Sequence, residues 1–215
     1  MITTSAPITI VYKAKATTRS GASCEGVETE YRITVNPIPT LTASETSKTI
    51  CSNQSTNISL SSNVVGTRYA WSISANPNIT GANSGSGASI NQNLINTSTI
   101  PQTITYTVVP TFENALVACN GDALTIEITV NPSPVVNFSG SDLSVCSGQT
   151  SPTVTLSSST PNAQITWTAN VPVGITGVNT LSGTTTIPTE TLLNNTNLPL
   201  TVVYTAIAKT DDANA

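Results

Sequence analysis

The sequence predicts an all-β protein made of tandem two-sheet sandwiches, each about 95 residues long. Three observations support this fold class. Ser and Thr make up 65 of the 215 residues and charged residues only 8%, so the chain lacks the Lys and Glu that helical surfaces use. Polar and apolar residues alternate in several stretches, as they do in half-buried strands. The third observation is an internal repeat.

The repeat is carried by residue types that are rare in this chain. Two Cys and an Asn-Pro-x-Pro motif recur at an offset of 95 residues: Cys24 with Cys119, Cys51 with Cys146, and Val35-Asn36-Pro37-Ile38-Pro39 with Val130-Asn131-Pro132-Ser133-Pro134. Two aromatic residues recur at 96 and 98: Trp71 with Trp167, and Tyr106 with Tyr204. Tyr12, which follows Pro7 as Tyr106 follows Pro101, is a third copy. Chance does not align so many rare residues.

These landmarks set the domain boundaries. Residues 1–37 are predicted to be the C-terminal part of a preceding repeat, 38–132 a complete repeat, and 133–215 the next repeat without its last strand. We therefore expect the chain to come from a longer tandem array. Because residues 1–37 carry two strands like the last two of the complete repeat, one molecule is also predicted to complete the next by strand addition.

Within the complete repeat, alternation predicts the strands. Thr103–Val109 and Leu124–Val130 alternate strictly, and the turn residues around Cys119–Asp122 predict a hairpin between them. Further strands are expected at 56–62, 67–73 and 89–96, which gives about seven in 95 residues. That number, with one central Trp, is typical of an immunoglobulin-like sandwich. Each Asn-Pro-x-Pro is expected to form a short, stiff linker.

The composition excludes several functions. The chain has no His, four Asp and seven Glu, so a Ser/His/Asp triad or a His-bearing zinc site cannot form, and we predict no enzyme. The net charge of −4 and the absence of a basic stripe argue against nucleic acid as a partner. No apolar run reaches the roughly 20 residues of a membrane helix, so no membrane insertion is expected.

The repeat resembles the PKD-like and immunoglobulin-like tandem repeats of Bacteroidota cell-surface adhesins, in particular gliding-motility adhesins of the SprB type. The resemblance rests on Ile50-Cys51-Ser52-Asn53-Gln54 with Val145-Cys146-Ser147-Gly148-Gln149, on the two Trp residues, and on the strands 103–110 and 128–132. It implies a secreted protein on the bacterial cell surface with an adhesive or mechanical role. The implied partners are neighbouring repeats and a surface polysaccharide or abiotic surface, and the implied sites include no catalytic residue.

The four Cys of a chain that looks secreted predict disulfides. We expect Cys51 to pair with Cys119 within the complete repeat, which closes a loop of about 68 residues. The alternative pairs Cys24 with Cys51 and Cys119 with Cys146 and joins adjacent repeats. It uses every Cys, but the closing strand is expected to carry the chain away from Cys24 before Cys51 is reached.

The aromatic residues have two interpretations. Trp71, Trp167, Tyr12, Tyr106 and Tyr204 occupy fixed places in the repeats, which favours core packing. The alternative is a carbohydrate-binding module, in which exposed aromatic faces stack on sugars beside loops such as 76–87.

No cofactor is predicted. Asp211, Asp212 and Asn214, and likewise Asn120 with Asp122, could offer oxygen atoms to calcium. Calcium takes about six to eight oxygen ligands, and neither cluster alone supplies them. Both are therefore interpreted as solvated turns, and calcium is left open as a ligand.

Overall fold

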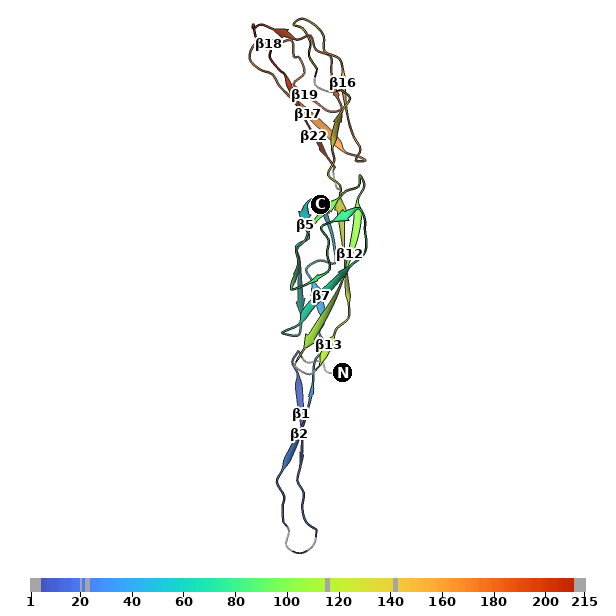
Figure 1. The fold of residues 1–215 in the computed structure, drawn as a ribbon, viewed down its shortest axis with the longest axis vertical. Coiled ribbons are helices and arrows are strands. Elements are labelled where there is room, and N and C mark those ends of the chain that lie inside the picture. Colours follow the sequence, from blue (N-terminus) through green and yellow to red (C-terminus); the bar gives the residue numbers. More distant parts are fainter. Residues whose placement is uncertain (1–4, 20, 22–23, 115–116, 141–142, 211–215) are drawn as a thin grey trace.

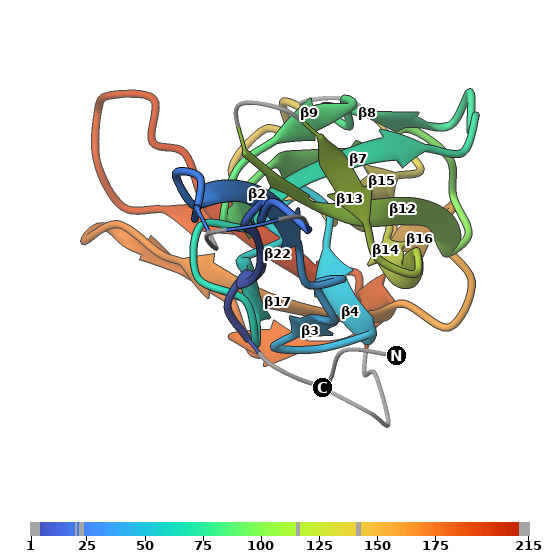
Figure 2. The same ribbon diagram turned by 90° about the horizontal axis from the view of Figure 1, so that it is seen from below.

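The computed structural model describes residues 5–19, 21, 24–114, 117–140 and 143–210. These residues form strands and loops without a helix, which confirms the all-β fold class. Within that part of the chain, no helix is long and apolar enough to cross a bilayer. The strands form three parts in a row: a hairpin, a central unit and a C-terminal unit (Figure 1). Seen along the long axis, the three parts overlap one another (Figure 2).

The hairpin consists of β1 (Ile8–Ala14) and β2 (Thr29–Val35), paired antiparallel over seven residues. Every residue of both strands is exposed. The hairpin extends away from the central unit (Figure 1), and no other described strand pairs with it.

The central unit is a two-layered sandwich. One layer is a sheet in the order β4-β14-β12-β7-β9, with β13 also paired to β12. Its strands are β4 (Ser47–Cys51), β7 (Arg68–Ile73), β9 (Gly85–Ser86), β12 (Gln102–Glu113), β13 (Ala118–Asn120) and β14 (Leu124–Asn131). The pair β4-β14 is parallel, whereas the other pairs of this sheet are antiparallel.

The other layer of the central unit comprises two three-stranded sheets, in the orders β10-β6-β3 and β5-β11-β8. Its strands are β3 (Leu41–Ala43), β5 (Gln54–Ser55), β6 (Ile58–Ser62), β8 (Ile79–Thr80), β10 (Ser89–Ile90) and β11 (Asn93–Asn96). The unit has more strands than the seven expected, because the expected strand 89–96 is divided into β10 and β11 and because short strands such as β5, β8, β9 and β13 were not predicted. Gly81, between β8 and β9, has a positive φ and sits so close to Asn93 that a Cβ would come 2.0 Å from its carbonyl oxygen.

The core of the central unit lies between the two layers. Alternation along the strands directs apolar side chains inward, as expected for half-buried strands. On β14, Ile126, Ile128 and Val130 are fully buried, and Glu127 between them is exposed. Together with residues of β4, β6, β7, β8, β10, β11 and β12 they form one cluster of fourteen buried residues.

The C-terminal unit has three small sheets, in the orders β15-β16-β20, β19-β17-β22 and β18-β21. Its strands are β15 (Val136–Phe138), β16 (Val154–Ser158), β17 (Gln164–Asn170), β18 (Ile175–Thr176), β19 (Ser182–Gly183), β20 (Thr186–Ile187), β21 (Leu193–Asn194) and β22 (Val203–Lys209). The buried cluster of this unit contains four residues: Leu156, Ile165, Trp167 and Ile187.

The two Asn-Pro-x-Pro segments lie where one part meets the next. At the first, the side-chain amide of Asn114 donates to Asn36 Oδ1 at 2.6 Å. Gly121 packs against Pro39, since a Cβ there would come 1.9 Å from the Pro39 carbonyl oxygen. At the second, Asn131 and Pro132 are buried. The chain therefore enters the central unit at one end and leaves it at the other (Figure 1).

Candidate functional site

Both Trp side chains are buried at equivalent places in the two units. Trp71 on β7 donates from Nε1 to the carbonyl of Asn83 at 3.1 Å, and Trp167 on β17 donates to that of Thr186 at 3.0 Å. Each indole is covered by a glycine: a Cβ on Gly85 or Gly183 would come 2.8 or 2.7 Å from the indole Cζ2 atom. The covered indoles have no free face for a sugar ring.

The Tyr residues of the repeat differ in their surroundings. Tyr106 is fully buried, and its hydroxyl donates to Gln92 Oε1 at 2.8 Å. Burial raises the pKa of Tyr106 to about 12. Tyr204 is half-buried and packs edge-on against Trp167, with ring centroids 5.6 Å apart.

The expectation that Tyr12 lies in a core is wrong. Its side chain is 56% exposed, and Tyr31, directly opposite on β2, is 69% exposed. The cause is the two-stranded hairpin, because no second layer covers these rings among the described residues. The two rings form an exposed aromatic pair.

A buried carboxylate in the C-terminal unit was not predicted from the sequence. Glu190 is 4% exposed and accepts hydrogen bonds from the backbone and side-chain nitrogens of Asn179 and from the backbone nitrogen of Thr180, at 3.0–3.2 Å. Burial acts to raise the pKa of Glu190, but these hydrogen bonds outweigh it and the pKa is lowered. At the 98-residue offset that relates Tyr106 to Tyr204, Glu190 corresponds to Gln92, a match that could have identified it.

The pKa of Tyr204 is raised, first by burial and then by the negative charge of Glu190. In the central unit, the neutral Gln92 accepts a hydrogen bond from the equivalent Tyr106 instead. Both side chains accept a hydrogen bond from the backbone nitrogen of an equivalent Asn, Asn83 in the central unit and Asn179 in the C-terminal unit, so the units differ in the interaction of this position with the Tyr.

All four Cys are free, so neither expected disulfide pairing forms in the structure. Cys51 lies beside Asn131, at the end of the central unit where β12 begins. Cys119 lies beside Phe112, at the other end of the same 12-residue strand. At about 3.3 Å per residue, some ten residues of β12 separate the two thiols by roughly 30 Å, whereas a disulfide requires Cα atoms within about 7 Å.

The alternative pairing fails for the same reason. Cys24 precedes β2 in the sequence and lies in the loop of the hairpin. Cys51 lies at the end of the central unit that is far from the hairpin. Cys119 faces the hairpin side of the central unit, whereas Cys146 belongs to the C-terminal unit. Alternating patterns in the sequence do not reveal which end of a sandwich a residue occupies.

The structure describes only one of the two oxygen clusters considered as calcium ligands, Asn120 with Asp122. Asn120 is engaged through Oδ1, which accepts from Thr111 Oγ1 at 2.9 Å. Within the described ranges, no three Cys, Asp or Glu residues come together to hold a metal ion. Asp211, Asp212 and Asn214 lie outside the described residues.

The C-terminal unit has a groove of about 800 Å³ along residues 199–204, which lead into β22 and form its first two positions. Polar residues such as Ser151 and Thr201 line it together with apolar or aromatic ones, among them Phe138, Val154, Ile187, Leu192, Leu200 and Tyr204. β22 pairs with β17 on one side, and no described strand pairs with its other edge. We call this groove and the free edge of β22 the open groove.

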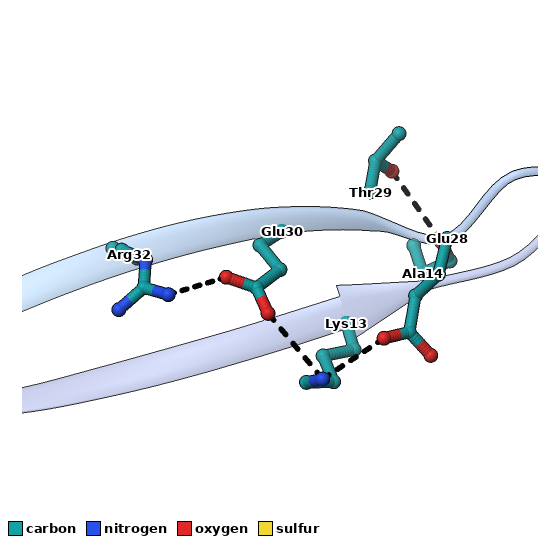
Figure 3. Close-up of polar contacts among 6 residues, drawn as sticks. All are labelled: Lys13, Ala14, Glu28, Thr29, Glu30 and Arg32. Atoms are coloured by element: carbon teal, nitrogen blue, oxygen red, sulfur yellow. Dashed lines mark hydrogen bonds and ion pairs between the residues drawn. The ribbon is translucent and has the colours of Figure 1, made fainter.

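The hairpin has two chemically different faces. One face carries Ile8, Ile10, Tyr12, Tyr31, Ile33 and Val35, all exposed, and we call it the apolar face. On the other face Lys13 contacts Glu28 at 2.9 Å and Glu30 at 3.3 Å, and Glu30 also contacts Arg32 (Figure 3). The face with these ion pairs is suited to water, whereas the apolar face lacks a partner among the described residues.

A comparison with known families places the central unit. Residues 48–134 match the family model described as a PKD-like domain. The central unit is similar to a PKD-like domain. Domains of this type are typically non-catalytic structural modules of extracellular proteins, so this segment suggests such a module. No curated protein matches the chain.

Proposed function

We propose that this chain is a structural and adhesive module of a large secreted adhesin, which supports attachment or gliding at a bacterial cell surface. The observation that carries the proposal is the end-to-end arrangement of the parts, with the chain entering and leaving the central unit at opposite ends (Figure 1). A tension along such an array passes through each unit in turn. The match of residues 48–134 to a PKD-like domain supports an extracellular setting.

The parallel pair β4-β14 suits a load-bearing role. β4 lies near the start of the central unit and β14 at its end, so tension pulls these two strands in opposite directions along their length. Their five paired positions, from Glu127↔Ser47 to Asn131↔Cys51, would then be sheared together rather than opened one by one. We infer that this pair resists unfolding under force.

A matched pair of proline variants tests the mechanical role. Ser52 N donates to Asn131 O and Glu127 N donates to Thr46 O, so period-two alternation directs the N–H of Lys48 toward β14 and that of Thr49 away from it. Single-molecule pulling should show a lower unfolding force for Lys48→Pro than for Thr49→Pro, because Pro cannot donate. Equal forces for the two variants would refute a load-bearing β4-β14 pair.

The adhesive part of the proposal is tested by binding. Binding of the chain is measured by titration with a panel of bacterial polysaccharides and, separately, by adsorption to abiotic surfaces. Both measurements are made with and without calcium. Saturable binding to either would make these units a gripping element. Absence of binding by the folded chain would leave a spacer role and would refute adhesion by these units.

A second candidate, a carbohydrate-binding module, is favoured by one observation: the exposed pair Tyr12 and Tyr31. Aromatic faces of this kind can stack on sugar rings. The loop 76–87 gives it less support, since Asn76 and Asn83 are engaged within the unit. Glycan binding that is lost in Tyr12→Ala/Tyr31→Ala, but retained in Lys13→Ala on the other face, would support this function.

A further inference from the structure

The hairpin and the C-terminal unit present complementary parts of one sandwich. In the central unit, β14 places Ile126, Ile128 and Val130 in the core, where all three are fully buried. At the repeat offset of 95, these residues correspond to Tyr31, Ile33 and Val35 on β2, which are exposed by 69%, 41% and 37%. In the C-terminal unit the corresponding position beside β22 is the open groove.

We propose that β2 of a second copy of this chain pairs antiparallel with the free edge of residues 200–206, the start of β22 and the segment leading into it, and places Tyr31, Ile33 and Val35 in the open groove. The occupant is a second copy because the two surfaces lie at opposite ends of one molecule, with the central unit between them (Figure 1). The contact joins two different surfaces, so it leaves a hairpin free at one end and a groove at the other. Repetition therefore builds open chains of molecules head to tail.

The central unit supplies the expected register. There Tyr106 is paired with Ile126, Ile104 with Ile128 and Gln102 with Val130. Transferred by the repeat offsets, this pairing sets Tyr204 opposite Tyr31, Val202 opposite Ile33 and Leu200 opposite Val35. The backbone of β22 presents unpaired hydrogen-bonding groups in this register. Ala169 N donates to Leu181 O, away from β22, so at the pair Ala169↔Tyr204 the backbone groups of Tyr204 point to the free edge.

The proposed docking is a strand exchange. Tyr12↔Tyr31 and Ile8↔Val35 on the hairpin repeat the register of Tyr106↔Ile126 and Gln102↔Val130. β1 therefore occupies the same edge of β2 that β22 would take, and β2 must leave β1 to dock. The exchange keeps the number of ladder hydrogen bonds similar and adds burial of three apolar side chains. An isolated two-stranded hairpin is marginally stable in water, which makes its opening easy.

The first experiment is sedimentation of the unmodified chain over a wide concentration range. We expect the mean mass to rise with concentration through dimers to longer species. A monomer mass that is independent of concentration up to the millimolar range would overturn the proposal.

Variants of adjacent residues separate the two faces of β2. Ile33→Asp places a charge on the apolar face, and Thr34→Asp places the same charge on the other face of the same strand. We expect Ile33→Asp to weaken association at least tenfold and Thr34→Asp to change it less than threefold. Equal effects of the two variants would exclude docking through the apolar face.

A mixing experiment tests the head-to-tail geometry. Ala206→Pro removes a backbone donor that points to the free edge of β22, since Ala206 lies two residues from Tyr204. This variant keeps its hairpin, whereas Ile33→Asp keeps its groove. Each alone should be monomeric, and a mixture should form heterodimers that grow no further. A mixture that stays monomeric would overturn the proposal, even where Ala206→Pro disturbs its own C-terminal unit.

A covalent lock tests the exchange itself. Thr9 and Thr34 are directly opposite on β1 and β2, with their hydroxyl oxygens 3.0 Å apart, so Cys at both positions can form a disulfide across the hairpin. The lock is introduced into a chain whose four native Cys are Ser. We expect the oxidised protein to be monomeric and the reduced protein to associate. Association of the oxidised protein would refute strand exchange.

Discussion

Tyr106 in the central unit is fully buried, whereas Tyr204, at the equivalent place in the C-terminal unit, is half-buried beside a groove. The strands around the two residues are alike: β9-β7-β12 in one unit corresponds to β19-β17-β22 in the other. The difference is β14, which lies beside β12 and has no described counterpart beside β22. β4, on the far side of β14, also lacks a described counterpart. The buried core has fourteen residues in the unit with these strands and four in the unit without them.

The largest expected effect comes from the strand that closes the core. Ile128→Ala removes a fully buried side chain from β14 and should reduce the stability of the central unit by about 4 kcal/mol. Ile33→Ala, at the equivalent place on β2, should change stability by less than about 0.5 kcal/mol, because Ile33 is exposed.

This comparison is measured by denaturant unfolding in a Trp167→Phe background, where Trp71 reports on the central unit. Dilute solutions avoid stabilisation by association. Similar losses in the two variants would show that Ile33 on β2 is packed in a core as Ile128 on β14 is, and would contradict the exposed hairpin.

The second prediction concerns alkaline pH. Burial raises the pKa of Tyr106 to about 12, above the value of about 10 for an unfolded chain. Burial of the neutral Tyr106 side chain therefore contributes fully to the stability of the central unit below about pH 10. This contribution is lost as the pH rises toward 12, by roughly 3 kcal/mol in total. Tyr106→Phe should show a flatter loss of central-unit stability over this range. The same slope in both proteins would contradict the assignment to Tyr106.

The third prediction concerns the stability of the C-terminal unit at acid pH. The pKa of Glu190 is lowered, so its stabilising effect is present above the ordinary Glu pKa and is lost as the pH falls through the lower folded value. Glu190→Gln should destabilise the unit by about 1 kcal/mol at pH 7, since charged acceptors bind N–H groups more strongly, and should remove this acid dependence.

Trp167 fluorescence in a Trp71→Phe background follows this unit. Gln92→Glu is the reciprocal test in the central unit, where a carboxylate would face the Tyr106 hydroxyl. An unchanged acid profile in Glu190→Gln would show that the Asn179 and Thr180 contacts do not hold a charged group.

The sequence predicted the all-β fold class, because strict alternation along 103–109 and 124–130 reflects burial on one face of a sheet. The same reasoning placed Tyr12 in a core, and that was wrong. Alternation specifies which face of a strand is apolar, but not whether another layer covers that face. For the same reason, neither the open groove nor the apolar face of the hairpin could be predicted from their residues alone, and both depend on which strands are neighbours in space.

The Cys pairing was wrong for a related reason, and it leads to the smallest expected effect. Cys51 and Cys119 lie at opposite ends of the central unit, so neither can constrain the unfolded state by closing the 68-residue loop between them. Reduction, or Cys51→Ser/Cys119→Ser, should therefore change the stability of the central unit by less than about 0.5 kcal/mol, whereas a loop of that size closed by a disulfide would contribute about 4 kcal/mol. Thiol titration of the monomer should find all four thiols reactive after mild denaturation, since each Cys is free. A melting temperature that falls by several degrees on reduction would mean that the two ends of the sandwich come together, and would invalidate the strand order on which the comparison of the two units is based.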